Sequence, residues 1–238
     1  GTIQLMQSNG VHVEWCRELH NADIALARSK VLSSFLASTC THCLSIDSDM
    51  GWDPKHILRL FAAKKDFVAV AGPKKFEPVK FAANYTDDYG AGKPLVFDPE
   101  SGTFEMGEIG FAFTLITRSC AQRMIDAYPE LSAESITGQM QNFVFLPFIE
   151  ELPKKEGGTR RVYRSEDFAF CRRWQRIGGK VYCCADIPLK HIGDKKYEGA
   201  MMDAWKAEDA MKRERAAQQQ PQLPGDGQIM IQSVKAEE

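Results

Sequence analysis

A short apolar segment that ends abruptly in two aspartates constrains this chain more than any other feature. Cys43–Ile46 has the composition of a buried strand, and Asp47 and Asp49 follow it two positions apart. Because strand side chains alternate faces, extended geometry through this point would direct both carboxylates the same way. Asp53-Pro54 then signals the start of a helix. In open α/β sheets, ligands bind beside the carboxyl ends of strands, so the pair indicates a ligand site.

The chemistry of two convergent carboxylates narrows the kind of ligand. They form a hard oxygen site, which suits Mg²⁺ or Mn²⁺ held jointly with a substrate phosphate. Two other motifs share the Asp-x-Asp pattern. An EF-hand loop would need glycine where Trp52 stands and glutamate where Leu58 stands. A haloacid-dehalogenase phosphatase would need threonine or valine in place of Gly51, so neither motif fits.

The order of apolar segments predicts the fold class. Apolar residues recur at helical spacing over 24–36, the strand before Asp47 follows, a helix begins near Pro54, and Phe67–Ala71 is typical of a second buried strand. With an alternating strand over 11–15, this order predicts an α/β fold with a doubly wound, mostly parallel sheet. Later patterns predict strands over 109–116 and 180–184, an extended segment over 187–192, and helices over 117–128 and 166–177.

Length and composition bound the organisation of the chain. Its 238 residues suffice for one α/β domain, which we expect over 1–199, followed by a helix over 200–217. The stretch 218–238 is rich in glutamine, proline and glycine and predicts a disordered tail. A net charge of −2 gives no sign of a nucleic-acid partner.

Hydropathy and cysteine usage bear on the compartment. No apolar run reaches the roughly 18 residues of a membrane span, and no signal segment begins the chain, so neither is expected. The seven cysteines are an odd number without disulfide-scaffold spacing, which favours reduced thiols and a cytoplasmic location. Cys40 and Cys43 have metal-like spacing, but no second pair follows, so zinc or redox chemistry is not favoured.

Several segments between positions 11 and 199 together resemble a known family. They are Ala27-Arg28-Ser29, Ile46-Asp47-Ser48-Asp49, Gly110–Arg118, Ser165–Arg173 and Leu189–Gly193, in that order. On these residues the chain resembles a nucleotide-sugar-dependent glycosyltransferase of the GT-A fold, closest to the family-2-like members. Residues 2–10 have the pattern of the last turns of a helix closed by Asn-Gly. In that family a first strand precedes this helix, so the resemblance implies an N-terminally incomplete domain.

The resemblance implies a metal-dependent hexosyltransferase-like enzyme. Its donor would be a nucleoside diphosphate sugar, UDP-sugar first of all, and its acceptor a hydroxyl of a glycan or another molecule. Asp49 would bind Mn²⁺ or Mg²⁺, Asp47 the metal or the ribose, and His191 would complete the metal site. A divalent ion stabilises the charge that grows on the diphosphate leaving group.

The same resemblance assigns acid–base and donor-binding roles. An inverting transferase needs a carboxylate to take the proton of the acceptor hydroxyl; Asp167 matches that position, and Glu166 would position the acceptor. Both residues open a helix, so capping alone is the alternative explanation, and the helix N-terminus should lower the pKa of Asp167. The implied nucleotide or donor contacts are Arg28, Gly110, Phe111, Lys195 and Lys196. Lys74 and Lys75, which follow the strand ending at Ala71, are either donor contacts or plain loop charges.

Two other functions remain open on the sequence. A sugar nucleotidyltransferase would carry a glycine-rich, basic signature near its N-terminus, and no such signature is present in this sequence. A catalytically silent domain that only binds nucleotide or sugar is the alternative outside enzymes. Metal-dependent nucleotide binding without turnover would distinguish it from a transferase.

Overall fold

The computed structural model describes residues 1–18, 21–134, 138–154, 156–193 and 196–218. It divides into two compact units, Gly1–Met202 and Asp203–Glu238. The second unit contains most of α7 (Met201–Gln218), which occupies the stretch where the sequence predicts a helix. The tail predicted over 218–238 lies, beyond its first residue, outside the described residues. None of the described helices combines the length and apolar character needed to cross a membrane.

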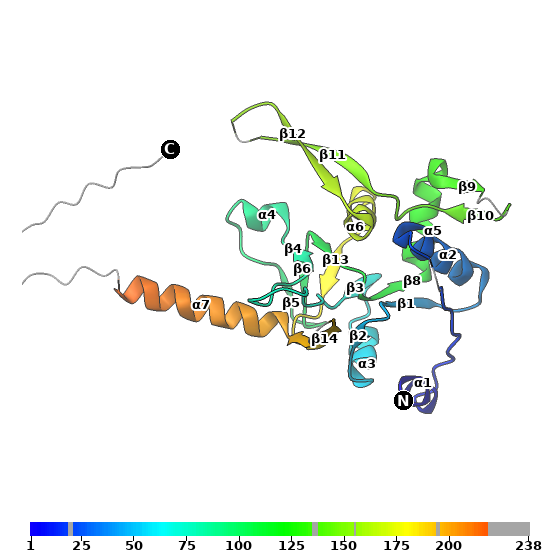
Figure 1. Ribbon diagram of the computed structural model, residues 1–238, viewed down its shortest axis with the longest axis horizontal. Helices are drawn as coiled ribbons and strands as arrows, with labels where there is room; N and C mark the ends of the chain where they lie inside the picture. The colour runs from blue at the N-terminus through cyan, green and yellow to red at the C-terminus, as the bar shows by residue number, and fades with distance from the viewer. Residues whose placement is uncertain (19–20, 135–137, 155, 194–195, 219–238) are drawn as a thin grey trace, which may run out of the picture. The chain divides into compact units, whose positions relative to one another are not determined.

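A six-stranded sheet forms the centre of the first unit (Figure 1). Its strands, in spatial order, are β1 (His42–Ile46), β8 (Phe113–Thr117), β3 (Phe67–Ala69), β13 (Val181–Cys183), β6 (Thr103–Met106) and β5 (Phe97–Asp98). Only β3 and β13 pair in parallel, and the other neighbours are antiparallel. The fold is therefore mixed α/β with a mostly antiparallel sheet and several small hairpins.

The prediction of a doubly wound, mostly parallel sheet is wrong, and β8 is the main reason. β1 and β3, joined through α3 (Lys55–Ala62), do run in the same direction, since each pairs antiparallel with β8. They are not neighbours, because β8 lies between them with the opposite direction. The segment over 11–15 predicted as a strand has no regular secondary structure.

The remaining strands form small separate sheets. β14 (Leu189–Ile192) pairs with both β2 (Met50–Gly51) and β15 (Lys196–Gly199). The two-stranded pairs are β4 (Ala83–Asn84) with β7 (Glu108–Ile109), β9 (Ser132–Glu134) with β10 (Met140–Asn142), and β11 (Phe148–Pro153) with β12 (Thr159–Arg164). The pairing of β14 with β2 brings a late segment of the chain beside the aspartates that follow β1.

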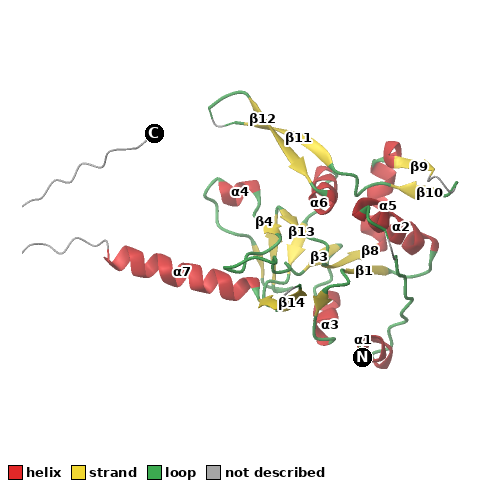
Figure 2. Ribbon diagram, in the orientation of Figure 1, coloured by secondary structure: helices red, strands yellow, loops and turns green. Residues whose placement is uncertain are grey.

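Helices cover both faces of the central sheet. Figure 2 shows α2 (Ile24–Ala37), α5 (Arg118–Ala127) and α6 (Glu166–Arg176) on one side and α3 on the other. The short elements α1 (Thr2–Ser8), α4 (Asp87–Gly90) and the 3₁₀ turn Pro129–Leu131 complete the described helices. Under α6 the core is aromatic: the Phe111 ring lies 5.4 Å from Phe67 and 4.9 Å from Phe170. Phe111 thus anchors the loop that leads into β8.

An ionic cluster with two buried glutamates lies at the base of the β11–β12 hairpin. We call Glu108, Glu150, Arg164, Arg172 and Arg176 the hairpin cluster. Arg164 Nε lies 2.7 Å from Glu150 Oε2, and its Nη1 lies 2.7 Å from Glu108 Oε1. Arg172 Nε donates to Glu108 at 3.0 Å, and Arg176 Nη2 donates to Glu150 at 2.8 Å. Each glutamate is therefore met by more than one arginine, which buried carboxylates require.

Candidate functional site

The predicted site residues gather at one edge of the central sheet. β1 and β3 end at this edge, and antiparallel β8 begins there. Asp47 directly follows β1, Phe111 lies two residues before β8, and Asp167 lies in the first turn of α6. Three segments that are far apart in the sequence therefore place their residues at the same edge of the sheet.

Arg28, on α2, lies between two of the predicted carboxylates. Its Nη1 is 3.3 Å from Asp47 Oδ1, and its Nε is 3.0 Å from Asp167 Oδ1. The guanidinium also donates to Ser45 Oγ at 3.3 Å and lies over the Phe111 ring. Only 8% of the Arg28 side chain is exposed, and its charge is paired with the protein's own carboxylates. Arg28 therefore positions Asp47 and Asp167 at this edge of the sheet.

Asp167 is only partly satisfied. Its Oδ2 accepts a hydrogen bond from the Phe111 backbone N–H at 3.1 Å. Its Oδ1 and Arg28 Nε are close, yet they are not aligned for a hydrogen bond, and neither atom has a hydrogen-bond partner among the described residues. Buried polar atoms without a partner are rare in native proteins. Here the two atoms face each other at 3.0 Å as an ion pair that lacks hydrogen-bond geometry.

Burial sets the protonation of Asp167. Burial raises its pKa to about 6, helped by the nearby charges of Glu166 and Asp47 and opposed by Arg28 and the Phe111 N–H. The expectation that the helix N-terminus would lower this pKa is wrong, because desolvation outweighs the helix and the ion pair. A carboxylate with this pKa is mostly ionised at neutral pH and is still a competent base.

Asp49 faces different partners from Asp47. β1 ends at Ile46, and the Met50 N–H donates to the Asp47 carbonyl at 3.1 Å, which closes a turn. Asp49 Oδ2 lies 3.0 Å from His191 Nε2 and 2.8 Å from Lys75 Nζ. The two carboxylates predicted to converge are thus separated by the turn, because strand alternation does not continue past the end of the strand.

The hydrogen bonds of His191 define its tautomer. Its Nδ1 lies 2.7 Å from the Pro73 carbonyl oxygen, which can only accept, so we assign a proton to Nδ1. In the neutral ring, Nε2 then carries a lone pair and faces the Asp49 carboxylate. Two facing acceptors are stable only when a proton or another cation lies between or beside them. A backbone carbonyl behind the other ring nitrogen is also typical of metal-binding histidines.

The Asp49–His191 pair fits a divalent ion. Ligands at about 2.1 Å that subtend a right angle are about 3.0 Å apart, which is the separation of these two atoms. Magnesium-type sites commonly use one or two protein ligands and complete the shell with substrate phosphates and water. Among the described residues, however, no three histidine, cysteine or acidic side chains converge. Of the three predicted metal ligands, Asp49 and His191 therefore lie together, and Asp47 does not join them.

The pKa of Asp49 depends on its burial and on its two partners. Burial would raise the pKa of Asp49, but its contacts with Lys75 and His191 outweigh that effect and hold the pKa below its usual value. Asp49 is therefore a carboxylate at neutral pH, as a metal ligand must be.

The other predicted residues occupy varied positions around this edge. Gly110 is closely packed: an added Cβ would lie 3.2 Å from Ala82 Cβ, a tight contact, and 3.6 Å from Asp167 Oδ2, an ordinary one. Glu166 is half-buried at the start of α6. Lys74 and Lys196 are exposed. Lys195 lies outside the described residues.

Sequence reasoning missed two features of the site. The Pro73 carbonyl holds the His191 ring, but a backbone contact leaves no signal in the side-chain pattern. The second is the pairing of Lys75 with Asp49. The sequence places Lys75 in the loop after the strand that ends near Ala71, although it does not indicate which carboxylate the ammonium contacts.

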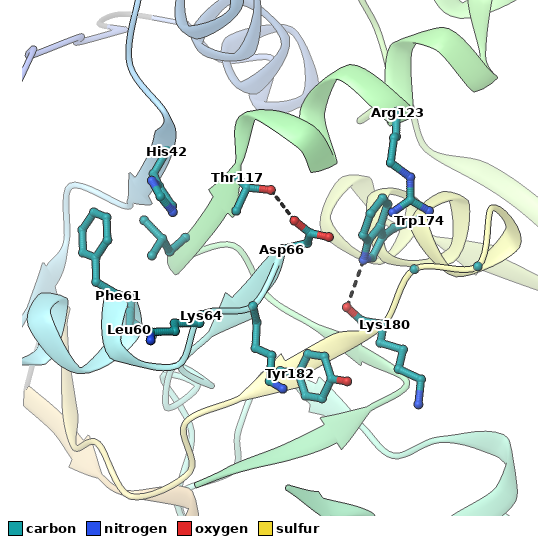
Figure 3. A pocket seen from close by; sticks show the side chains of 14 residues that line it. His42, Leu60, Phe61, Lys64, Asp66, Thr117, Arg123, Trp174, Lys180 and Tyr182 are labelled. Atoms are coloured by element: carbon teal, nitrogen blue, oxygen red, sulfur yellow. Dashed lines mark hydrogen bonds between the residues drawn. The ribbon is translucent and has the colours of Figure 1, made fainter. Parts of the chain in front are cut away.

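A cavity of about 580 Å³ lies at the opposite edge of the sheet (Figure 3). It is lined at the point where β1, β3 and β13 begin, by residues that include His42, Asp66, Trp174 and Lys180. None of the predicted site residues lines it. Its lysines largely serve local ion pairs, such as Lys180 with Glu105 at 2.8 Å. The chemistry argued above therefore depends on the exposed edge and not on this cavity.

Comparisons with known proteins give little further guidance. No protein-family model matches the sequence, and a search of curated proteins finds no match. Among solved structures, the chain is similar to "Crystal Structure of A197 from STIV", with 16% identity over 84% of this chain and 82% of that one. The TM-score is 0.42, and a likeness at that level carries no argument. The function has to be argued from the site.

Proposed function

We propose that this chain is a metal-dependent glycosyltransferase that moves a sugar from a nucleoside diphosphate sugar to an acceptor hydroxyl. One observation carries the proposal: a buried carboxylate with a pKa near 6 lies at the same sheet edge as a carboxylate–imidazole pair spaced for a cation. The correction to the sheet topology does not weigh against it, because function depends on the site and unrelated folds support the same chemistry.

Each group has a definite role in this proposal. Asp49 and His191 would hold Mn²⁺ or Mg²⁺, which supplies positive charge for the diphosphate leaving group. Asp167 would accept the proton of the acceptor hydroxyl. Arg28 orients Asp167 and keeps it ionised, and Asp47 holds Arg28 from the other side. Glu166, in the first turn of the same helix, would position the acceptor.

The finer assignments belong to the same proposal. A base placed to activate the acceptor directly favours an inverting reaction, and we take UDP as the first donor nucleotide to test. A cytoplasmic location agrees with the thiols, since each of the seven cysteines is free.

Thermal unfolding with UDP, ADP and GDP, with and without Mn²⁺, tests the binding half of the proposal. A ligand at 100 times its Kd stabilises the folded state by about 2.7 kcal/mol. We expect stabilisation by one nucleotide, dependent on Mn²⁺, and its loss in Asp49→Asn. The matched control is Asp53→Asn, whose carboxylate accepts the Lys55 backbone N–H at 2.8 Å. Unchanged Mn²⁺ dependence in Asp49→Asn would rule out this metal site.

Turnover of the matching donor tests the catalytic half. Asp167→Asn keeps the shape of the side chain and removes the proton acceptor, so we expect a loss on the order of 10²–10⁴-fold in kcat with donor binding little changed. Glu166→Gln, at the neighbouring position, should lose less. Nucleotide binding without any turnover would instead identify a silent binding domain. A product that keeps the donor's anomeric configuration would contradict the inverting mechanism.

A further inference from the structure

A lysine already occupies the place where a cation would meet Asp49. Lys75 Nζ donates to Asp49 Oδ2 at 2.8 Å, and the same oxygen lies 3.0 Å from His191 Nε2. One carboxylate oxygen therefore faces both the ammonium and the imidazole. No other described acid is paired with Lys75, so this contact with Asp49 is the charge partner of its ammonium.

The path of the Lys75 side chain is built into the fold. Its stem passes over Gly193, where an added Cβ would lie 3.0 Å from Lys75 Cδ and 3.2 Å from Cε. A side chain at position 193 would force the lysine stem to shift by a few tenths of an ångström. The backbone just before Lys75 is also held, because the Pro73 carbonyl accepts a hydrogen bond from His191 and the Lys74 N–H donates to the Lys80 carbonyl at 2.6 Å.

The ammonium can nevertheless leave. The Lys75 side chain is 41% exposed and that of Asp49 is 39% exposed, so neither group is locked in the interior. Exposed ion pairs of this kind are weak and are easily exchanged for other partners. A second anion close by, such as a diphosphate, would offer the ammonium an alternative acceptor.

We propose that Lys75 is a tethered cation that competes with divalent metal for Asp49 and moves to the diphosphate when the nucleotide binds. This inference rests on the proposed function for the identity of the ligand. An ammonium and a divalent ion repel each other, so both cannot share one carboxylate oxygen at full strength. Metal alone must displace Lys75, whereas metal with a diphosphate gives Lys75 a new partner.

Cooperative binding follows from this exchange. If the nucleoside diphosphate removes the competitor of the metal, it raises metal affinity, and by linkage the metal raises nucleotide affinity by the same factor. A nucleoside monophosphate, which lacks the second phosphate, should give a smaller effect. Removing the ammonium should make the metal bind more tightly by itself and should weaken the coupling.

Titration of free Mn²⁺ by electron paramagnetic resonance, without and with UDP or UMP, tests the exchange. For Lys75→Met we expect Mn²⁺ alone to bind about tenfold more tightly than to the wild type, which is a modest coupling. The additional gain with UDP should fall toward that with UMP. Lys75→Arg keeps the charge and should behave like the wild type. Lys74→Met, the adjacent exposed lysine, is the control for the change in net charge.

The outcomes separate this inference from the proposed function. Equal Mn²⁺ affinity in Lys75→Met and the wild type would overturn the competition, and so would an equal gain in Lys74→Met. If the wild type binds Mn²⁺ and Asp49→Asn does not, the proposed metal site survives that failure. If no variant binds Mn²⁺ with or without UDP, the proposed metal site and the competition both fail.

Discussion

Two buried ionic groups in this chain use similar residues and reach opposite states. In the hairpin cluster, three arginines surround Glu108 and Glu150, and the closest contacts are 2.7–3.0 Å. At the candidate site, one arginine, Arg28, stands between Asp47 and Asp167, and two of the facing atoms lack a hydrogen bond. The first group has an excess of donors, and the second has an excess of acceptors.

The pKa values follow this difference. Burial would raise the pKa of Glu150, but Arg164, Arg176 and Arg172 outweigh it, so the pKa is lowered. Burial raises the pKa of Asp167 to about 6, and Arg28 does not offset it. Removing one partner from a fully paired buried cluster is costly, whereas an under-paired buried acid already costs stability and has the shifted pKa typical of functional groups. By this difference, the hairpin cluster has the character of a structural group and Asp167 that of a candidate catalytic group.

Breaking the hairpin cluster should have the largest effect. Glu108, 1% exposed, is shared by Arg164 and Arg172. Glu108→Gln would leave two buried guanidinium groups under-compensated, which typically costs about 3–5 kcal/mol of unfolding free energy. Urea denaturation followed by far-UV circular dichroism measures the loss.

The control for that experiment is an exposed ion pair. Asp88→Asn removes the contact with Lys93, in which both side chains are more than half exposed. Such pairs contribute at most about 1 kcal/mol. If both variants lose equally little, the hairpin cluster does not have the structural role assigned to it.

Asp167→Asn should move stability in the opposite direction. The folded pKa of about 6 lies above the ordinary value of 3.8, so the folded state binds more protons between these values, and stability falls as pH rises through this window. With about 1.4 kcal/mol per pKa unit, the ionised acid costs up to about 3 kcal/mol above pH 6. The neutral asparagine avoids that cost.

Melting temperatures at two pH values check this prediction. Asp167→Asn should melt above the wild type at pH 8, and the gain should vanish near pH 4, where the wild-type acid is protonated. An equal loss at both pH values would indicate that Asp167 is a structural ion-pair partner of Arg28, like the acids of the hairpin cluster.

Removing Arg28 should have the smallest effect of the three. Arg28 lowers the pKa of Asp167, so Arg28→Met should raise it further. The acidic limb of the kcat/KM profile should then move to higher pH by about one pH unit. The same substitution with Asp167→Asn as background removes the limb altogether. A limb that stays in place would mean that another group controls it.

The sequence identifies individual groups better than their arrangement. Asp49 and Asp167 are found because a strand end and a helix start leave local signals. The strand partners are not found, since periodicity shows that a segment is a strand and not which strand lies beside it or in which direction. The insertion of reversed β8 between β1 and β3 is such a case. Extrapolating alternation past Ile46 failed for the same reason, because a turn is set by local backbone contacts.

The burial of Asp167 was also beyond local reasoning. Its position at a helix start is visible in the sequence, but the aromatic core around Phe111 and the partner Arg28 come from distant segments. The desolvation of Asp167 is therefore visible only in the tertiary structure, and it raises the pKa that its helix position was expected to lower.

The contact between Asp49 and His191 joins positions 142 residues apart, and this separation has a consequence for synthesis. At about 5–20 residues per second, a ribosome would take on the order of ten seconds to reach the histidine after the aspartate has been made. Lys75 follows Asp49 by 26 residues and is therefore available much earlier. The lysine is therefore made long before the imidazole, and the complete pair forms only when β14 docks onto β2.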